Sequence, residues 1–460
     1  MEQDNPKSVI PHDDTEKPPY CATATELNHG IRCCRPGICN GLKPFVLSAI
    51  QPAMTAAPLP FNPIPRQIER VARERLQGYP AIVVTGPRQS GKTTLARILA
   101  PDRPYFSLEE PDTRAFAVED PRGFLAKAQQ GAILDEVQRV PDLLSYLQGI
   151  LDSERGMGRF ILTGSSQFEL LESITQTLAG RVSMLTLLPF SLGELQSAGR
   201  APETVDALLH AGLFPPIHDR RLDPTAWLQD YVGTYLERDV RQVLNVQDLA
   251  GFQRFVQLCA GRIGQLLNVS SLAMDTGINR ATAEAWLSVL QASHVVHLVQ
   301  PWFGNRSKRL IKTPKLFFCD CGLAAWLLGV RRSEHVSAHP QRGALFENWA
   351  VTELLKARLN HGQRPDLHFL RDKVGHEVDI VIETAPGRLQ AVEIKSGVTV
   401  ASDFFDGLNY WRTRLEGRAL MPWLIHGGDA DADRSGTRVL PWSALSPLLA
   451  ALAGPPTPDP

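Results

Sequence analysis

The chain has 460 residues, of which 43% are hydrophobic and 21% are charged, and its formal net charge is −1. This length exceeds one ordinary core, because domains usually hold roughly 100 to 200 residues. The balanced charge excludes binding of polyanions through overall basicity, so a polyanion would have to meet local patches. No stretch approaches the roughly 20 apolar residues of a membrane span, so we expect no membrane partner and a cytosolic protein.

Residues 1–60 are rich in proline, glycine, serine and asparagine and show no sustained apolar period. This composition predicts a disordered leader. A second interpretation is that Met54 is the natural start, because ordered patterns begin only a few residues beyond it. Four of the seven cysteines fall in this segment without the paired spacing that zinc sites usually show, so disorder is favoured over a metal site.

Short apolar strands alternate with helical segments from residue 61 to about residue 190. Such alternation predicts a parallel α/β sheet, whose ligands bind beyond the carboxyl ends of the strands. We assign residues 61–190 to this domain. Helices are predicted at 64–76, 94–100 and within 121–129, and strands at 81–84, 105–108, 131–134 and 159–163.

A phosphate-binding loop lies between the first predicted strand and the helix after it. The sequence from Gly86 to Thr93 reads Gly-Pro-Arg-Gln-Ser-Gly-Lys-Thr, the complete pattern G-x-x-x-x-G-K-[ST]. The glycines let the backbone wrap a phosphate, Lys92 reaches the β- and γ-phosphates, and Thr93 offers a hydroxyl to Mg²⁺. We therefore expect ATP and Mg²⁺ as ligands. The predicted nucleotide-binding residues of the loop are Gly86, Pro87, Arg88, Gln89, Ser90, Gly91, Lys92, Thr93 and Thr94.

An acidic pair follows the strand at 131–134. Asp135 is predicted to contact the Mg²⁺ shell, and Glu136 to act as the base that activates water. The alternative is a surface pair that caps the next helix. Thr163 and Ser165, at the end of the following strand, are candidates to sense the γ-phosphate or position water, unless they form a plain turn. Arg181 is a candidate arginine finger, in cis or from a neighbouring subunit, although a surface arginine would look the same.

Residues 191–250 are predicted to form a helical connector, and residues 251–330 a helix-turn-helix with a wing. The helices are expected at 252–267, 269–276 and 280–292, with a tight turn at 277–279, and the wing strands at 295–299 and 315–318.

The wing supplies the clearest basic patch of the chain. Its tip, residues 305–309, reads Asn-Arg-Ser-Lys-Arg and is followed by Lys312, which suits sequence-independent contacts to a phosphate backbone. The second helix carries Arg280 but also Glu284, so base readout is not supported. Nucleic acid is therefore a candidate partner, and a wing used only for packing between domains is the alternative.

The C-terminal part, residues 331–450, is predicted to be a smaller α/β domain followed by a tail at 451–460. Helices are expected at 343–359 and 403–415, and strands at 367–370, 378–382 and 389–395. A turn at 384–388 would place Asp379 opposite Glu393 and Glu377 opposite Lys395. The core-facing side of this hairpin would then carry Val378, Ile380, Ile382, Val392 and Ile394.

Two carboxylates that face each other across a ladder repel unless they share a cation. With Glu347 on the preceding helix, Asp379 and Glu393 are candidate ligands of Mg²⁺ or Mn²⁺, and Lys395 could steady a nucleophile. These are the parts of a PD-(D/E)xK nuclease site. The alternative is a solvated polar face in which Glu377 and Lys395 form an ordinary cross-strand pair.

An ordered series of short motifs carries a family resemblance over roughly residues 61–425. The runs are GPRQSGKTTLAR, ILDEVQRVPDLL, RFILTGSSQFELL, LAGRV, LLPFSLGEL and YLERDV. The chain resembles the prokaryotic AAA-family ATPases that carry a C-terminal domain of unknown function 4143. The resemblance implies an AAA-type P-loop ATPase domain, a winged helix and a restriction-endonuclease-like C-terminal domain.

These observations predict a Mg²⁺-dependent ATPase coupled through a winged helix to a nuclease-like domain that acts on nucleic acid. The alternative is a nucleotide-controlled interaction protein whose C-terminal domain binds a partner without cutting phosphodiesters. A small-molecule kinase ranks last, because no acceptor-binding pattern is evident. The sequence leaves open the oligomeric state and a protein partner.

Overall fold

The computed structural model describes residues 63–153, 156–165, 177–236, 248–302, 312–415 and 417–453. The predicted leader at 1–60 lies outside these ranges. The predicted tail lies outside them from residue 454 on, whereas residues 451–453 belong to helix α19 (Ser446–Ala453). Within the described ranges, no helix is both long enough and apolar enough to span a membrane.

Five parallel strands form the first sheet, in the order β2-β3-β4-β1-β5. Strand β1 is fully buried and pairs with β4 on one side and with β5 on the other, so the loop after β1 leaves from the interior of the sheet. The predicted parallel α/β sheet is confirmed. The strands are β1 (Ala81–Thr85), β2 (Tyr105–Ser107), β3 (Ala132–Asp135), β4 (Phe160–Thr163) and β5 (Val182–Thr186).

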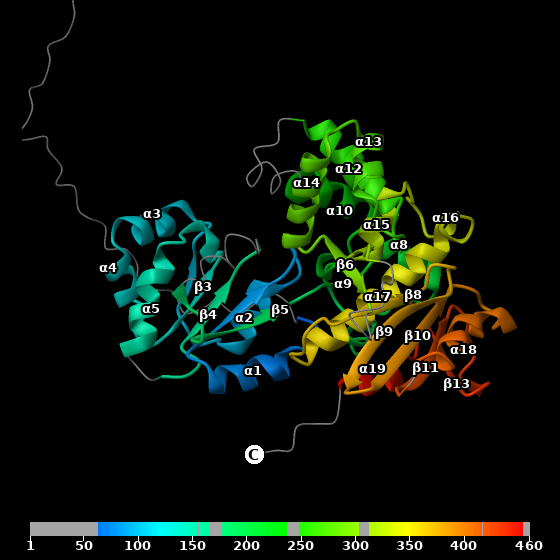
Figure 1. Ribbon diagram of the computed structural model, residues 1–460. Coiled ribbons are helices and arrows are strands. Elements are labelled where there is room, and N and C mark those ends of the chain that lie inside the picture. The colour runs from blue at the N-terminus through cyan, green and yellow to red at the C-terminus, as the bar shows by residue number, and fades with distance from the viewer. Residues whose placement is uncertain are drawn as a thin grey trace, which may run out of the picture. The chain divides into compact units, whose positions relative to one another are not determined.

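Helices cover both faces of this sheet (Figure 1). Alternate residues of β1 point to opposite faces, so Ile82 packs in one cluster with Leu95, and Val83 packs in another with Phe124 and Leu147. The first face is covered by α1 (Glu69–Gly78) and α2 (Lys92–Leu99), and the second by α4 (Pro121–Ala126) and α5 (Leu143–Ser153). Helix α3 (Pro111–Glu119) and the short turn η1 (Val137–Arg139) complete this part.

A helical region follows the first sheet. Its members are α7 (Leu192–Ser197), α8 (Val205–Ala211), α9 (Pro215–Asp219), α10 (Pro224–Tyr231), η2 (Val232–Leu236), α12 (Leu249–Ala260), α13 (Val269–Thr276) and α14 (Arg280–Ala292). The predicted helical connector at 191–250 is described up to residue 236 and again from residue 248. The two helices and the tight turn predicted at 269–292 are present: Gly277 ends α13 with φ +83°, and the Asn279 side chain accepts a 2.8 Å hydrogen bond from the Thr282 N–H.

The second sheet has eight strands in the order β12-β13-β11-β10-β9-β8-β6-β7, with both parallel and antiparallel pairs. The predicted wing strands β6 and β7 belong to it, because β6 pairs with β8 at Gln300 and His368. One sheet therefore crosses the predicted boundary at residue 331, so the segments predicted as a winged helix and as a C-terminal α/β domain contribute strands to the same sheet. The strands are β6 (Val296–Pro301), β7 (Lys315–Phe318), β8 (His368–Arg371), β9 (Glu377–Ala385), β10 (Arg388–Lys395), β11 (Ala419–His426), β12 (Ala432–Arg434) and β13 (Thr437–Pro441).

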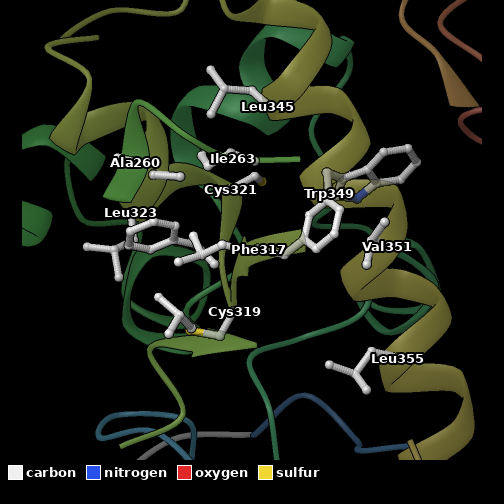
Figure 2. Packing of buried hydrophobic residues seen from close by; sticks show 14 of the residues in the cluster. Ala260, Ile263, Phe317, Cys319, Cys321, Leu323, Leu345, Trp349, Val351 and Leu355 are labelled. Carbon is white, nitrogen blue, oxygen red and sulfur yellow. The ribbon is translucent and has the colours of Figure 1, made fainter. Parts of the chain in front are cut away.

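One core joins the helical region to this sheet. Figure 2 shows buried side chains of α17 (Arg342–Asn360), among them Trp349, Val351 and Leu355, together with Phe317 of β7. All four belong to one cluster, and α17 packs against β7. Helix α18 packs on the opposite side of the sheet, where Trp411 joins a separate cluster. The remaining helices are α15 (Cys321–Leu327), α16 (Glu334–Ser337), α17 (Arg342–Asn360), η3 (Ser402–Phe405) and α18 (Asp406–Arg412).

The β9–β10 hairpin has the predicted register but a shorter turn. Its pairs run from Glu383 and Leu389 to Ile380 and Val392, and only residues 386–387 lie between the strands, not 384–388. Strand β9 shifts register against β8 between residues 378 and 381, as a bulge would. Val378 therefore packs with the cluster of Trp411. The prediction that it shares a face with Ile380 is wrong, because Ile380 belongs to the other cluster.

Candidate functional site

Backbone geometry explains why the phosphate-binding loop needs its glycines. Gly86 has φ +141°, and a Cβ there would lie 2.1 Å from the carbonyl oxygen of Leu187. Gly91 has φ +96° and precedes the first helical residue, Lys92, with no side chain capping the helix. The first N–H groups of α2 are thus left for a ligand at the end of β1.

The loop lysine is held against its own loop. The Lys92 Nζ donates to the carbonyl oxygens of Gly86 at 3.0 Å and Pro87 at 2.9 Å, and its side chain is buried. The Ser90 hydroxyl is buried and has no hydrogen-bond partner in the described part of the chain. An ammonium and an unused hydroxyl in one loop fit a polyanionic ligand.

The Asp135 carboxylate accepts hydrogen bonds from side chains of α2, β2 and β4. The Thr93 hydroxyl donates to both carboxylate oxygens at 3.1 Å, Tyr105 donates at 2.6 Å, and Thr163 donates as well. A threonine hydroxyl beside an aspartate carboxylate is a donor set that suits Mg²⁺. Burial, followed by the charge of Asp135, raises the pKa of Tyr105, so the phenol stays protonated and donates.

Glu136 is held in a strained and polar setting next to Asp135. Its φ is +58°, which is uncommon for a residue with a side chain. Its carboxylate accepts a 3.0 Å hydrogen bond from Ser165 and another from Gln138. Burial acts to raise the pKa of Glu136, but Lys92, Arg88 and these hydrogen bonds outweigh it, so the pKa lies below its ordinary value. The carboxylate is therefore ionised at neutral pH.

One cavity of about 390 Å³ is lined by Lys92, Thr93, Asp135 and Glu136. Its walls also come from segments outside the first sheet, namely Phe190 and residues 215, 216, 219 and 220 at α9. The predicted residues that do not line the cavity are Gly86, Pro87, Ser90 and Thr163, and each is hydrogen-bonded to a residue that does, namely Lys92, Arg66 or Asp135. The predicted residues that line the cavity are Arg88, Gln89, Gly91, Lys92, Thr93, Thr94, Asp135 and Glu136.

Sequence reasoning missed Arg66, which ties the loop to the chain beyond β5. Its guanidinium donates to the carbonyl oxygens of Ser90 at 2.8 Å and Leu188 at 2.6 Å, and to Glu194 at 3.2 Å. Glu194 also accepts from the N–H of Gln67 at 2.7 Å. An arginine just before a helix looks like a surface residue, so no local signal in the sequence indicates this role.

The predicted arginine finger does not reach the cavity within one chain. Arg181 forms an ion pair with Asp152, with Nε 2.5 Å from Oδ1, in an exposed setting. It does not line the cavity. A role from a neighbouring subunit stays a prediction.

The second predicted set of residues does come together. The Lys395 Nζ lies 2.5 Å from a Glu393 oxygen, and Asp379 accepts a 2.8 Å hydrogen bond from the Ile394 N–H. Glu347 lies close enough to interact electrostatically with Asp379 and Lys395, and the Lys315 Nζ lies 3.0 Å from one of its oxygens. The predicted pairing of Glu377 with Lys395 is not found, because the pairing of β9 with β10 ends at Ile380 and Val392. Glu377 contacts Lys315 and Arg371 instead. We call Glu347, Glu377, Asp379 and Glu393 the acid cluster.

Burial and mutual repulsion shift the pKa values of carboxylates in the acid cluster. Burial, together with the charge of Asp379, raises the pKa of Glu393 to about 8, against the opposing effect of Lys395. Burial also raises the pKa of Glu347 to about 7, although Lys315 opposes it. Burial would lower the pKa of Lys315, but Glu347, Asp379 and Glu377 outweigh it and raise the pKa above its usual range. The lysine is therefore charged.

In this arrangement the cluster does not fit the predicted Mg²⁺ or Mn²⁺. Among the described residues, no three histidine, cysteine or acidic side chains are grouped so that they could hold a metal ion. The Lys315 ammonium binds two of the four carboxylates, Glu347 and Glu377.

The wing tip at 305–309 lies outside the described residues, and Lys312 beside it is exposed. Arg280 of α14 forms an exposed ion pair with Glu284, with Nε 2.7 Å from Oε1.

Comparison with known proteins divides the chain into three matched segments. Residues 78–196 match the AAA domain, residues 202–334 a domain of unknown function (DUF8612), and residues 342–445 a domain of unknown function (DUF4143). The phosphate-binding loop, Asp135 and Thr163 fall in the first segment. Lys315 falls in the second, and the acid cluster in the third.

Similar proteins occur in mycobacteria and archaea. Uncharacterized protein Rv2008c of Mycobacterium tuberculosis and uncharacterized protein Mb2031c of Mycobacterium bovis are each 33% identical over 327 residues, which cover 70% of this chain and 72% of the relative. The Walker-type ATPase of Pyrococcus abyssi is 16% identical, with 58% of this chain and 98% of that chain covered and a TM-score of 0.41. A signal transduction ATPase with a tetratricopeptide repeat sensor from Pyrococcus horikoshii is 15% identical, with 66% and 48% covered and a TM-score of 0.20.

Proposed function

Given that this chain belongs to the family of AAA-domain proteins that carry a C-terminal domain of unknown function 4143, we propose that it binds and hydrolyses ATP. The observation that carries the proposal is the setting of Glu136. This carboxylate lines the cavity beside the loop lysine, is oriented by two hydrogen bonds and has a lowered pKa. Such a group suits the activation of a water molecule.

The residues of the loop would hold the nucleotide. Lys92 would exchange its two carbonyl partners for phosphate oxygens, and the helix N-terminus behind it favours anions. Thr93 and Asp135 would hold Mg²⁺ through the hydroxyl and carboxylate that now bind each other. When bound, Mg²⁺ offsets the charge on the phosphate oxygens.

Glu136 would accept the proton of the attacking water. Ser165 and Gln138 fix its carboxylate, and Thr163 links it to Asp135, because the Thr163 hydroxyl donates to Asp135 and accepts from the Glu136 N–H at 3.3 Å. A carboxylate that is held and ionised before the substrate arrives loses little freedom during the reaction.

The test compares Glu136→Gln with wild type in ATP-analogue binding and in phosphate release. We expect the variant to keep its affinity and to lose about 10²- to 10⁴-fold in turnover, the usual contribution of a general base. Glu119→Gln, on the exposed end of α3, is the matched control and should behave as wild type. Full turnover by Glu136→Gln would refute this assignment.

For the C-terminal domain we propose binding of a partner, protein or nucleic acid, without cleavage. Lys315 inside the acid cluster favours this function over a metal-dependent nuclease. The test is incubation of plasmid with Mg²⁺ or Mn²⁺, with and without ATP, for wild type and Asp379→Ala. Equal, background-level cleavage by both supports binding alone, and cleavage that Asp379→Ala abolishes would replace it by a nuclease.

A further inference from the structure

We propose that Lys315 is a built-in cation of the acid cluster, which takes the place of a divalent metal ion and keeps the C-terminal domain metal-free. This inference is independent of ATP hydrolysis, since it concerns a cluster in a different matched segment. The residues predicted for this site from the sequence were Glu347, Asp379, Glu393 and Lys395, and Lys315 was not among them.

The lysine is firmly placed. Its side chain is only 3% exposed, and its Nζ lies 3.0 Å from a Glu347 oxygen, in contact with Glu377 and 5.6 Å from the centre of the Phe369 ring. Strand β7 is held on both sides, because Lys315 pairs with Val299 of β6 and forms a bridge with Leu266. A buried ammonium persists only where carboxylates compensate its lost hydration.

The charges of the cluster are nearly balanced by side chains of the chain itself. Three of the four carboxylates contact a cation: Glu347 and Glu377 contact Lys315, Glu377 also contacts Arg371, and Glu393 contacts Lys395. Asp379 accepts from the Ile394 N–H. A divalent ion placed among them would stand close to the Lys315 ammonium and be repelled by it. Without Lys315, the same four carboxylates would face only two cations.

Backbone segments also close around the cluster. A Cβ on Gly264, where φ is +71°, would lie 2.8 Å from a Glu347 oxygen. A Cβ on Gly407 would lie 2.0 Å from the Glu377 carbonyl oxygen and 3.4 Å from Glu393 Oε2. Mg²⁺ in proteins usually keeps several waters, and such close packing suits a compact ammonium better than a hydrated ion.

One acceptor of the cluster is unused. Glu393 Oε2 is buried and has no hydrogen-bond partner among the described residues, and Glu393 as a whole is only 6% exposed. A buried acceptor without a donor calls for a partner, such as a water molecule or an ion. Without the Lys315 ammonium, the carboxylates around Glu393 would therefore rearrange to hold a cation, which their present arrangement does not hold.

The experiment measures Mn²⁺ binding to the full chain without nucleotide by electron paramagnetic resonance. The variants are wild type, Glu393→Gln, Lys315→Met and the double variant, and the matched control is Lys127→Met, an exposed lysine on the first sheet domain. Mn²⁺ bound at Thr93 and Asp135 is common to all of them and drops out of the comparison.

We expect wild type, Glu393→Gln and Lys127→Met to bind equal amounts of Mn²⁺. Lys315→Met should bind about one additional Mn²⁺ per chain, its melting temperature should rise by about 4 °C with Mn²⁺, and Glu393→Gln should abolish both gains. A Lys315→Met chain that folds only with Mn²⁺ supports the proposal equally.

Two results overturn the proposal. If wild type binds more Mn²⁺ than Glu393→Gln, the cluster is already a metal site despite its lysine, and this comparison holds even when Lys315→Met fails to fold. If Lys315→Met binds no more Mn²⁺ than wild type, the lysine does not take the place of a cation.

Discussion

Replacing Arg66 by methionine should destabilise the fold strongly. Methionine keeps an apolar stem over the Phe190 ring, 4.8 Å from the guanidinium carbon, but removes the charge and all donors. The Arg66 side chain is 6% exposed and that of its partner Glu194 is 1% exposed. The substitution thus leaves a buried carboxylate without its counter-ion and the Ser90 and Leu188 carbonyls without a donor.

Removing one member of a buried ion pair typically costs about 3–5 kcal/mol. Glu194 keeps hydrogen bonds from the N–H groups of Gln67 at 2.7 Å and Ser191 at 2.9 Å, which places the expected loss toward the lower end of that range. The double variant Arg66→Met with Glu194→Gln should recover at least about 1 kcal/mol, because no buried charge is then unpaired.

The assay is urea unfolding followed by fluorescence, with ATP-analogue affinity as a second measurement. Affinity should fall because Arg66 holds the loop at Ser90. The control is Arg73→Met, which breaks an exposed pair with Glu69 whose side chains are 50% and 25% exposed, and it should change stability by less than about 0.5 kcal/mol. An Arg66→Met loss below about 1 kcal/mol, or one equal to that of the control, would refute the reasoning.

Two further predictions concern single positions. Gly86→Ala should abolish ATP-analogue binding, because the new Cβ would meet the Leu187 carbonyl oxygen at 2.1 Å, whereas Gly78→Ala, with nothing within 4 Å, should bind normally; equal binding by both would contradict this. The raised pKa of Glu393 stabilises the fold while the carboxyl is neutral, a contribution present below the ordinary value of 4.5 and lost as the pH rises toward about 8. Glu393→Gln should therefore melt at the same temperature as wild type in acid and at a higher one above about pH 8, and parallel melting curves across the pH range would contradict this.

Local patterns predicted the first sheet and its loop because strand, turn and helix signals there are contiguous in sequence. Strand β5 was missed, since only Leu185 of its residues is buried and Met184 is exposed, so it lacks an apolar run. Strand β11 was missed because Pro422 argues against a central strand, although β11 pairs with both β10 and β13.

The contacts that complete both sites are long-range, and no local signal marks them. Tyr105 reaches Asp135 from a neighbouring strand, and Arg66 reaches Glu194 over 128 positions of sequence. The register of the β9–β10 hairpin followed from the predicted turn between the strands, but the bulge that moves Val378 to the other face depends on pairing with β8. Lys315 lies 32 positions before Glu347, and its direction is set by the sheet rather than by its neighbours in the chain.

The sheet that runs from β7 to β12 has a consequence for how this protein can change during evolution. Strands β6 and β7 and Lys315 come from the segment matched at residues 202–334, and the acid cluster comes from the segment matched at 342–445. Recombination that kept only the second segment would leave the edge of β8 unpaired. It would also remove the Lys315 ammonium that contacts Glu347 and Glu377. The two segments should therefore be inherited as one unit, whereas all five strands of the first sheet come from the segment matched at residues 78–196.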